Sequence, residues 1–272
     1  MKYKVLVLDI DGTLNNSKKE ISNITKKALI KAQEKGIIVV VASGRPTCGI
    51  THIAKELELE KYGGYILSFN GGRIINCKTN EIIYEKSIPQ KSVSELYDLS
   101  KEFGVNIITY TNDSVITEND DEYIDFECRV CRIKKQKVDS FKDSVSFPIP
   151  KCLMTGEGDY LAKIEPLVRE RLGADFNVFR SEPFYLEIMP QNIDKAYSLG
   201  KLLEHLGLSK NEMIACGDGF NDISMISFAG LGVAMANAQP SVKEVANFIT
   251  LSNDEDGIAH VVEKFIFEKC YA

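Results

Sequence analysis

The chain has 272 residues, the length of about two domains of average size. Hydrophobic residues make up 44% and charged residues 26% of the sequence, which is typical of a globular protein and excludes the disordered and fibrous classes. The 39 acidic and 33 basic residues give a net charge of −6, which argues against a general nucleic-acid or membrane-surface binder. The longest uninterrupted apolar run, Ile37 to Ala42, is far shorter than the roughly 18 residues of a membrane-spanning helix. We therefore expect neither a nucleic-acid nor a membrane partner.

The first residues and the cysteines bear on the cellular compartment. Acidic residues interrupt the apolar stretch of the N-terminal sequence MKYKVLVLDIDGT, which is unlike a secretory signal and is interpreted as the first strand of the fold. The seven cysteines, at positions 48, 77, 128, 131, 152, 216 and 270, are odd in number and scattered, which favours reduced thiols over a disulfide framework. Both features predict a cytoplasmic protein.

The first third of the chain alternates buried strands with helices, the pattern of βαβ units in a mostly parallel sheet. Strands are predicted over residues 3–10, 37–42, 65–69, 73–77 and 81–88, and a helix over 47–57. The last two strands are typical of a hairpin. Ser22 is placed to cap another helix, whose apolar face carries Ile24, Ala28 and Ala32, and Gly36 is placed to end it.

From residue 89 to 184 the pattern changes to that of a mixed α+β module. Helices are predicted over 93–103 and 160–172, and strands over 105–110, 114–117, 151–155 and 177–180, with a charged stretch in the middle. The strict alternation then returns, with strands over 185–189, 213–216 and 232–235 and helices over 199–206, 222–228, 242–246 and 258–265. We predict an α/β fold, a Rossmann-like doubly wound parallel sheet over residues 1–88 and 185–272, interrupted by an inserted α+β domain over residues 89–184.

Polar residues follow four of the predicted strands, where open α/β sheets bind their ligands. The runs are Asp9-Ile10-Asp11-Gly12-Thr13 after the first strand, Ser43-Gly44-Arg45 after the second, Lys195 after the strand that follows the insertion, and Gly217-Asp218-Gly219-Phe220-Asn221-Asp222 after the strand over 213–216. We expect these residues to meet at one edge of one sheet.

The residue types at this edge suit a hard divalent cation that bridges to a phosphate. The carboxylates of Asp9, Asp11, Asp218 and Asp222 would repel one another by about 4 kcal/mol per pair at 4 Å and an effective dielectric near 20. A cation removes this repulsion. Because no all-protein cage is apparent, we predict Mg²⁺, held by a few carboxylates, water and substrate oxygen. The glycines allow backbone N–H groups to approach phosphate oxygens closely.

The motifs DIDGT, ASGR, a lysine after the insertion and GDGFND, in this order, resemble those of the haloacid dehalogenase-like hydrolase superfamily. The insertion, with SFNGG before it and GVAMANA and SNDEDGIAHVV after it, is similar to that of the Cof-type phosphatases with a type IIB cap. The resemblance covers nearly the whole chain, and its motifs are specific in the core and weak inside the insertion. It implies a catalytic core over residues 1–88 and 185–272 and a cap over residues 89–184.

The resemblance also implies catalytic roles. Asp9 would be the nucleophile that accepts the phosphoryl group as an aspartyl-phosphate, and Asp11 would protonate the leaving oxygen and then activate water. Lys195 would stabilise the transferring group. The chemistry of the residues agrees, because an aspartate with a pKa of about 3.9 is ionised without a base. An acid has to keep a proton, so we expect burial and neighbouring charge to raise the pKa of Asp11 relative to that of Asp9.

The remaining site residues would bind phosphate and metal. By the same resemblance, the phosphate would be bound by Lys195, Asn221, the Ser43 side chain and the backbone amides of Ile10 and Gly44. The metal site would consist of Asp9, the backbone carbonyl of Asp11, Asp218, and Asp222 as the residue that orients a water ligand or Lys195.

The predicted function is Mg²⁺-dependent hydrolysis of a phosphate monoester of a small soluble organic molecule, such as a sugar phosphate. A sugar-phosphate mutase stays open, since such mutases share the DxDGT start and a similar cap. A non-catalytic phospho-ligand sensor on the same fold is the other alternative, although a sensor has no need of the acid Asp11. The motifs encode neither the substrate nor the oligomeric state.

Two further features are assigned to structure rather than to function. Cys128 and Cys131 have the spacing of a zinc or redox pair, but no second pair follows at finger spacing. The basic run from Arg129 to Lys137 follows an acidic run from Glu118 to Glu127. This order favours an internally compensated, solvated face over a surface that attracts an anionic substrate.

Overall fold

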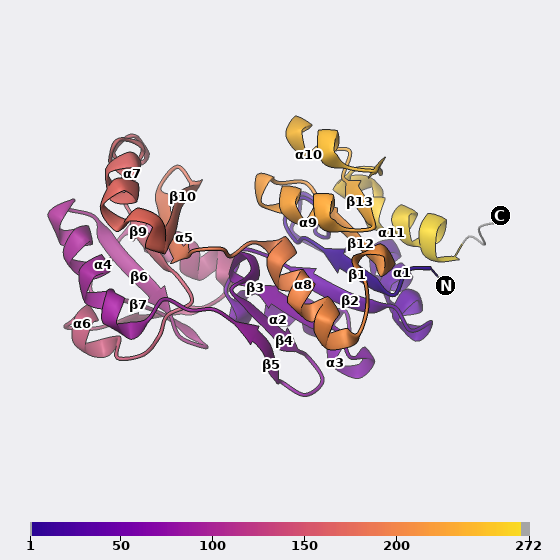
Figure 1. The fold of residues 1–272 in the computed structure, drawn as a ribbon, viewed down its shortest axis with the longest axis horizontal. Coiled ribbons are helices and arrows are strands. Elements are labelled where there is room, and N and C mark those ends of the chain that lie inside the picture. Colours follow the sequence, from indigo (N-terminus) through magenta and orange to yellow (C-terminus); the bar gives the residue numbers. More distant parts are fainter. Residues whose placement is uncertain (1, 268–272) are drawn as a thin grey trace. The chain divides into compact units, whose positions relative to one another are not determined.

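The computed structural model describes residues 2–267. The chain forms two compact units (Figure 1). The first unit contains the chain up to residue 44, residues 50–84 and the chain from residue 194 on; the second contains residues 45–49 and 85–193.

The first unit is built on an eight-stranded sheet in the order β14-β13-β12-β1-β2-β3-β4-β5. The strands are β1 (Val5–Leu8), β2 (Ile38–Ala42), β3 (Tyr65–Ser68), β4 (Arg73–Asn76), β5 (Ile82–Glu85), β12 (Met213–Gly217), β13 (Leu231–Ala234) and β14 (Phe248–Ile249). All pairs from β14 to β3 are parallel, and β4 runs antiparallel to β3. Val5 of β1 is in register with Ile38 of β2 on one side and with Met213 of β12 on the other. The strand order therefore changes direction at β1, which confirms the doubly wound fold.

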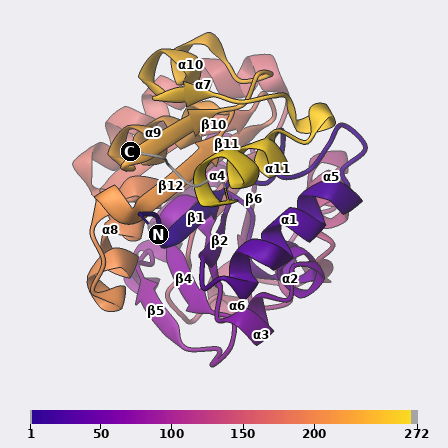
Figure 2. The ribbon, with the colours of Figure 1, turned by 90° about the vertical axis from the view of Figure 1, so that its right-hand side faces the viewer.

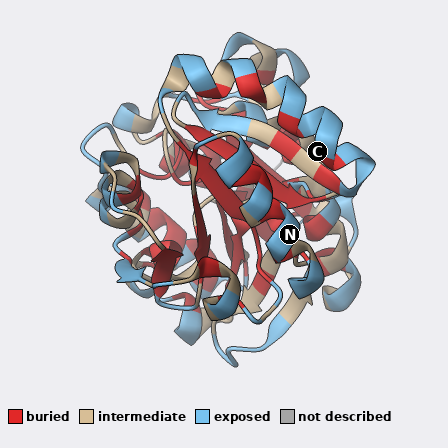
Figure 3. Ribbon diagram, turned by 90° about the vertical axis from the view of Figure 1, so that its left-hand side faces the viewer, coloured by how far each residue is buried: buried red, intermediate tan, exposed pale blue. Residues whose placement is uncertain are grey.

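Helices cover both faces of this sheet, so its central strands, such as β1, β12 and β13, are buried apolar runs. The helices are α1 (Asn23–Glu34), α2 (Thr47–Glu56), α3 (Leu59–Tyr62), α8 (Lys195–Leu206), α9 (Ile223–Phe228), α10 (Pro240–Val245) and α11 (Gly257–Val262). Helix α8 packs beside α9 on one side of the sheet, and α1 packs beside α11 on the other (Figure 2). Every residue of β1 is buried. Figure 3 shows a contrast for the chain in general: most strands are coloured as buried, whereas the helices carry long stretches of exposed residues. The sequences of these strands therefore show little of the alternation of polar and apolar residues that marks a solvent-facing side.

Helix α1 begins as expected, and Ala28 and Ala32 of its predicted apolar face are buried, but Ile24 is not. The Ser22 hydroxyl accepts a hydrogen bond from the Thr25 amide, which confirms the predicted cap. Ile24, which we expected on the apolar face, is 63% exposed. The buried residues are Thr25, Ala28, Leu29, Ala32 and Gln33, which follow the i, i+3, i+4, i+7, i+8 spacing of one helix stripe. A stripe that starts at Thr25 fits this spacing, whereas one that starts at Ile24 does not.

The second unit is a six-stranded sheet in the order β10-β11-β9-β6-β7-β8. Its strands are β6 (Asn106–Tyr110), β7 (Ser114–Thr117), β8 (Lys134–Lys137), β9 (Cys152–Thr155), β10 (Phe176–Glu182) and β11 (Tyr185–Pro190), and its helices are α4 (Gln90–Glu102), α5 (Glu122–Cys131), α6 (Phe141–Ser144) and α7 (Gly158–Leu172). Only β7 and β8 pair in parallel among these strands. Side chains of α4 and α7, including Leu96 and Ile164, share one apolar core with the sheet.

The alternation of elements suggested that the strand over 185–189 belongs to the first sheet. It belongs instead to the sheet of the second unit. In β11, Ile188 is in register with Val178 of β10, and Leu186 with Met154 of β9. The connection between β10 and β11 is too short for the crossover that a parallel strand needs, so the two strands form a hairpin. The chain accordingly leaves the first unit after Tyr84 and returns at Asp194, rather than near Pro89 and Phe184.

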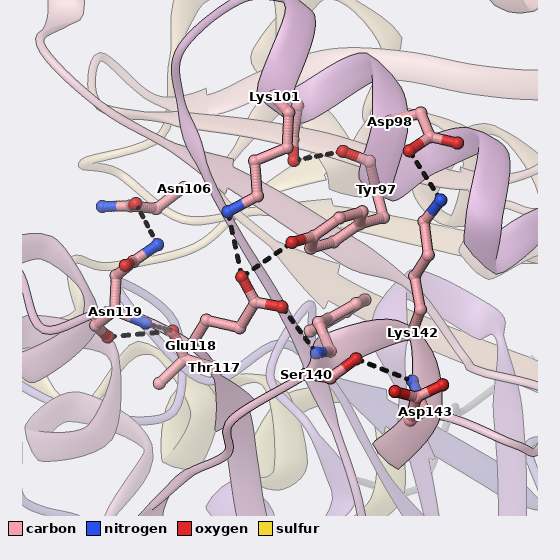
Figure 4. A network of polar contacts seen from close by, with 12 residues as sticks. Tyr97, Asp98, Lys101, Asn106, Thr117, Glu118, Asn119, Ser140, Lys142 and Asp143 are labelled. Carbon is pink, nitrogen blue, oxygen red and sulfur yellow. Dashed lines mark hydrogen bonds and ion pairs between the residues drawn. The ribbon is translucent and has the colours of Figure 1, made fainter.

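Glu118 connects three elements of the second unit (Figure 4). Its Oε2 accepts hydrogen bonds from the Tyr97 hydroxyl at 2.9 Å and the Lys101 ammonium at 3.0 Å, both on α4. Its Oε1 accepts from the Phe141 amide at 2.7 Å, at the start of α6. Burial would raise the pKa of Glu118, but the hydrogen bond from the Phe141 amide and the hydrogen bond and charge of Lys101 outweigh burial and lower the pKa. An ionised carboxylate thus fixes α4 and α6 to the end of β7.

The charged stretch forms ordered structure whose charges pair with one another. Helix α5 and strand β8 occupy it, and Lys135 contacts Asp120 at 2.7 Å and Asp125 at 2.6 Å. Lys137 contacts Asp120 at 2.5 Å. These pairs support the interpretation of an internally compensated face.

The cysteines at 48, 77, 128, 131, 152 and 216 are free thiols, and Cys270 lies outside the described residues. Among residues 2–267, we find no helix with the length and apolar character required to cross a membrane.

Candidate active site

The carboxyl ends of β1, β2 and β12 meet at one edge of the first sheet. Asp9 follows β1, Ser43 follows β2, and Asp218 follows β12. Since β1 lies between the other two strands, the residues that follow them are neighbours. The structure thus brings these three residues together at one edge of the sheet.

Lys195 reaches the same edge by another route. The strand before it, β11, belongs to the sheet of the second unit, so the expectation that Lys195 follows a strand of the same sheet is wrong. Lys195 is instead the first residue of α8, whose side chains Leu199 and Leu202 pack in the core of the first unit. The packing of a helix, rather than the end of a strand, positions the ammonium.

The Lys195 ammonium is fully buried and donates to three oxygens. It lies 2.7 Å from Asp9 Oδ1, 2.6 Å from Asp222 Oδ1 and 3.1 Å from the Ala42 carbonyl oxygen. Burial alone would lower its pKa, but the charges of Asp222 and Asp9 outweigh this effect and raise the pKa above the ordinary value. Lys195 therefore carries a permanent positive charge whose three protons are all engaged.

Three carboxylates cluster around this charge. One oxygen each of Asp9, Asp218 and Asp222 lies within 4.8 Å of the others. Burial, together with the charge of Asp222, raises the pKa of Asp9 to about 8 even though Lys195 opposes the shift. Burial also raises the pKa of Asp218 to about 6, against the hydrogen bond from Thr13. The single ammonium thus does not compensate the carboxylates.

Hard oxygen donors with uncompensated negative charge are what a divalent cation requires, so the cluster fits Mg²⁺. Asp222 has a supporting place in it. Its Oδ1 accepts from Lys195, and its Oδ2 accepts from the amides of Asp218 at 3.0 Å and Gly219 at 2.9 Å. Because both of its oxygens are engaged, we expect Asp9 and Asp218 to be the carboxylates that bind the metal directly.

Asp11 lies in a different environment from the one we expected. Its side chain is 37% exposed and forms an ion pair with Lys19 at 3.0 Å. Asp9, in contrast, is buried, and burial raises its pKa. The reason is that Asp9 ends the central buried strand, whereas Asp11 lies on the turn that follows it. The expected order of burial of the two carboxylates was therefore wrong.

The turn after β1 holds Asp218 in place. Gly12 has a φ of +84°, and a Cβ atom at this position would lie 2.2 Å from Asp218 Oδ2. The hydroxyl of Thr13 donates to Asp218 Oδ1 at 2.7 Å. The sequence offered this role only as part of the DIDGT motif, in which Thr13 was not assigned to the site. The signal available in the sequence was the position of the Thr13 hydroxyl, two residues after the site carboxylate Asp11.

Asn70, a residue that we did not predict, contacts two of the predicted phosphate-binding residues. Asn221 donates through Nδ2 to Asn70 Oδ1 at 3.0 Å. A Cβ atom on Gly44 would lie 3.1 Å from both side-chain polar atoms of Asn70, so the carboxamide lies directly against Gly44. Buried Ser43 precedes Gly44 at the end of β2. Asn70 therefore lies between the loop after β2 and the loop after β12.

Comparisons with known proteins agree with this arrangement. A family model described as haloacid dehalogenase-like hydrolase matches residues 6–262. The crystal structure of a haloacid dehalogenase-like hydrolase from Bacteroides thetaiotaomicron is 48% identical, with a TM-score of 0.94 over 97% of this chain and 99% of that chain. A 5-amino-6-(5-phospho-D-ribitylamino)uracil phosphatase of Bacillus subtilis is 31% identical over 269 residues, which are 97% of this chain and 96% of that protein.

A third similar protein is a sugar phosphatase of subclass IIB in the same superfamily. It is 26% identical, with a TM-score of 0.81 over 96% of this chain and 98% of that chain. The family model, the fold and the carboxylate cluster at the carboxyl ends of β1 and β12 lead to one assignment. The chain belongs to the haloacid dehalogenase-like hydrolase family.

Proposed function

We propose that this protein hydrolyses phosphate monoesters of small organic molecules in a Mg²⁺-dependent reaction, with Asp9 as the nucleophile. The observation that carries the proposal is the contact of the buried Lys195 ammonium with both Asp9 and Asp222, with Asp218 alongside. Two similar proteins are named as phosphatases, one of a phosphorylated uracil derivative and one of sugars, which supports the reaction type. Both names describe phosphates of small organic molecules.

The first half of the reaction transfers the phosphoryl group to the protein. The carboxylate of Asp9 attacks phosphorus, the bond to the ester oxygen breaks, and Asp11 donates a proton to that oxygen. Phosphoryl transfer depends mainly on positioning and on compensation of charge. Lys195, held by two carboxylates, supplies fixed positive charge beside Asp9. Mg²⁺, when bound, supplies the further charge that keeps Asp9 ionised at neutral pH and offsets the charge of the phosphate.

The second half releases phosphate. Asp11, now a carboxylate, accepts a proton from a water molecule that attacks the aspartyl-phosphate, and the acyl–oxygen to phosphorus bond breaks. Inorganic phosphate leaves, and Asp9 and the protonated Asp11 are regenerated. The exposed position of Asp11 suits this exchange, because protons and water reach a partly exposed carboxylate directly. Asn221 and the Ser43-Gly44 segment are the proposed phosphate ligands.

The decisive experiment measures phosphate released from a panel of sugar, nucleotide and aryl phosphates, in Mg²⁺ and in EDTA. We expect turnover only in Mg²⁺, and its loss by several orders of magnitude in Asp9→Asn, since an amide does not form the acyl phosphate. Asp175→Asn, at an exposed position of the second unit, is the matched control and should retain wild-type activity. More than about a tenth of wild-type turnover in Asp9→Asn would contradict the covalent mechanism. Isomerised sugar phosphate without free phosphate would identify a mutase instead.

We assign substrate selection to the second unit, as a cap of the type IIB kind. Every residue proposed for chemistry belongs to the first unit, which leaves residues 85–193 free to vary with the leaving group. Exchange of this segment for that of the Bacillus subtilis uracil-derivative phosphatase tests the assignment. We expect the preference among esters to follow the exchanged segment while the Mg²⁺ requirement stays unchanged. A preference that stays with the first unit would show that the second unit is not the selector.

A further inference from the structure

The turn after β3 has an unusual backbone. Phe69, Asn70 and Gly71 all have positive φ angles, of 53°, 53° and 104°. Non-glycine residues with positive φ are uncommon, and a bulky residue such as Phe69 adopts this conformation only at a cost in free energy. Two such residues in succession therefore require compensation from their surroundings.

That compensation comes from both neighbouring segments of the first unit. The Asn70 amide donates to the Ser43 carbonyl at 3.0 Å, which connects the turn to the loop after β2. The Ser198 hydroxyl donates to the Gly71 carbonyl at 2.5 Å, and a Cβ atom on Gly71 would lie 2.5 Å from the Asp194 carbonyl oxygen. The turn is thus held between the Ser43 loop and the first turn of α8, the helix that begins with Lys195.

The strained turn directs one side chain. The carboxamide of Asn70 accepts from Asn221 Nδ2 at 3.0 Å and lies against Gly44. An amide nitrogen has two donor hydrogens, so the bond to Asn70 occupies one and fixes the direction of the other. Asn221 is otherwise exposed, and the bond to Asn70 is its only side-chain hydrogen bond among the described residues.

We infer that Asn70 is a positioning residue of the phosphate site, which acts by fixing the Asn221 amide beside Gly44. This inference rests on the proposed function, in which Asn221 and Gly44 bind the transferring phosphate. Because loss of alignment of about 1 Å costs on the order of a hundredfold in rate, removal of the Asn70 carboxamide should lower kcat/KM by about tenfold to a hundredfold. The strained turn thus serves to align the Asn221 amide at the site.

The test separates the carboxamide from the backbone. Asn70→Gly keeps the positive φ without strain and removes the acceptor, whereas Asn70→Asp keeps the Oδ1 acceptor. Asn80 is the matched control, because it is an exposed asparagine with a φ of 57° in the turn between β4 and β5 and is not among the residues proposed for the site. Asn80→Gly should leave turnover and phosphate affinity at wild-type values.

Each variant is combined with Asn221→Ala. Steady-state turnover of an aryl phosphate with Mg²⁺ and the affinity for inorganic phosphate with Mg²⁺, measured by calorimetry, are compared. In the Asn70→Gly background, Asn221→Ala should cause little further loss in either quantity, because the amide is already misaligned. In the Asn70→Asp background it should cause a further loss close to that in the wild type. A turn that is merely structural predicts the same further loss in both backgrounds.

The outcomes also separate this inference from the proposed function. Additive effects of Asn70→Gly and Asn221→Ala, or wild-type phosphate affinity in Asn70→Gly, would overturn the role of Asn70 while leaving the phosphatase intact. A wild-type protein that binds phosphate but hydrolyses no ester would overturn the proposed function, and the coupling between the two asparagines would still be read from phosphate affinity. A wild-type protein that does not bind phosphate would overturn both.

Discussion

Lys195→Met should destabilise the metal-free protein strongly, because it removes the only cation that contacts Asp9 and Asp222 among the described residues. All three partners of the ammonium are buried, and the lysine itself has no exposed surface. Methionine has a similar length, so the change leaves two buried carboxylates without their partner. Loss of one partner of a buried ion pair costs about 3–5 kcal/mol. At about 2–4 °C per kcal/mol, the first unit should lose about 6–20 °C in thermal midpoint.

The assay is thermal unfolding in EDTA at pH 8 and at pH 5.5, and again in saturating Mg²⁺. We expect the largest loss at pH 8 in EDTA, a smaller loss at pH 5.5 because protons neutralise the carboxylates, and partial recovery in Mg²⁺, without recovery of turnover. Lys201→Met is the matched control, since Lys201 lies on the same helix in an exposed pair with Glu204. Its effect should be small and independent of Mg²⁺. Equal midpoints for the two variants in EDTA would refute the importance of the buried contacts.

Three further outcomes follow from the same geometry. Gly12→Ala should raise the Mg²⁺ concentration for half-maximal activity by about tenfold or more, since the new Cβ displaces Asp218; an unchanged Mg²⁺ titration would contradict this. In EDTA, stability against urea should fall as the pH rises from about 4 to about 8. The reason is that the raised pKa of Asp9, about 8, lets the folded state hold a proton that the unfolded state has released. Stability that rises with pH over this range would contradict the raised pKa. Lys151→Met should destabilise the second unit by about 3–5 kcal/mol, because it leaves Glu187 buried without its partner at 3.1 Å. Hydrogen exchange on β9 and β11 measures this loss, and unchanged protection would exclude it.

The sequence predicted those strands whose residues are all buried to a similar extent. Strands β1 and β2 are buried on both faces, so they appear as continuous apolar runs that end at polar loops. Strand β8, Lys134–Lys137, is exposed along its whole length and has no apolar residue, so no pattern distinguished it from the charged stretch. Strand β11 was predicted as a strand but assigned to the wrong sheet, because the pattern of a strand does not encode its partner.

The site was predictable to the extent that its chemistry lies in charged motif residues. Asp9, Lys195, Asp218 and Asp222 meet as expected, although they come from distant parts of the chain. Asn70 was missed because an asparagine before glycines is typical of a turn, and its contact with the site depends on a left-handed backbone that no local pattern shows. The burial of Asp9 relative to Asp11 depends equally on tertiary packing.

The central place of β1 in its sheet sets an order of events during synthesis. Val5 of β1 pairs with Met213 of β12, so one edge of the first strand has no partner until the ribosome has made the chain up to β12. At 5–20 residues per second, the roughly 150 residues between β3 and β12 take about 7–30 s. An apolar edge exposed for that time invites aggregation or chaperone binding. The second unit is nearly continuous over residues 85–193, and it can fold while the N-terminal half of the sheet still waits for its partner.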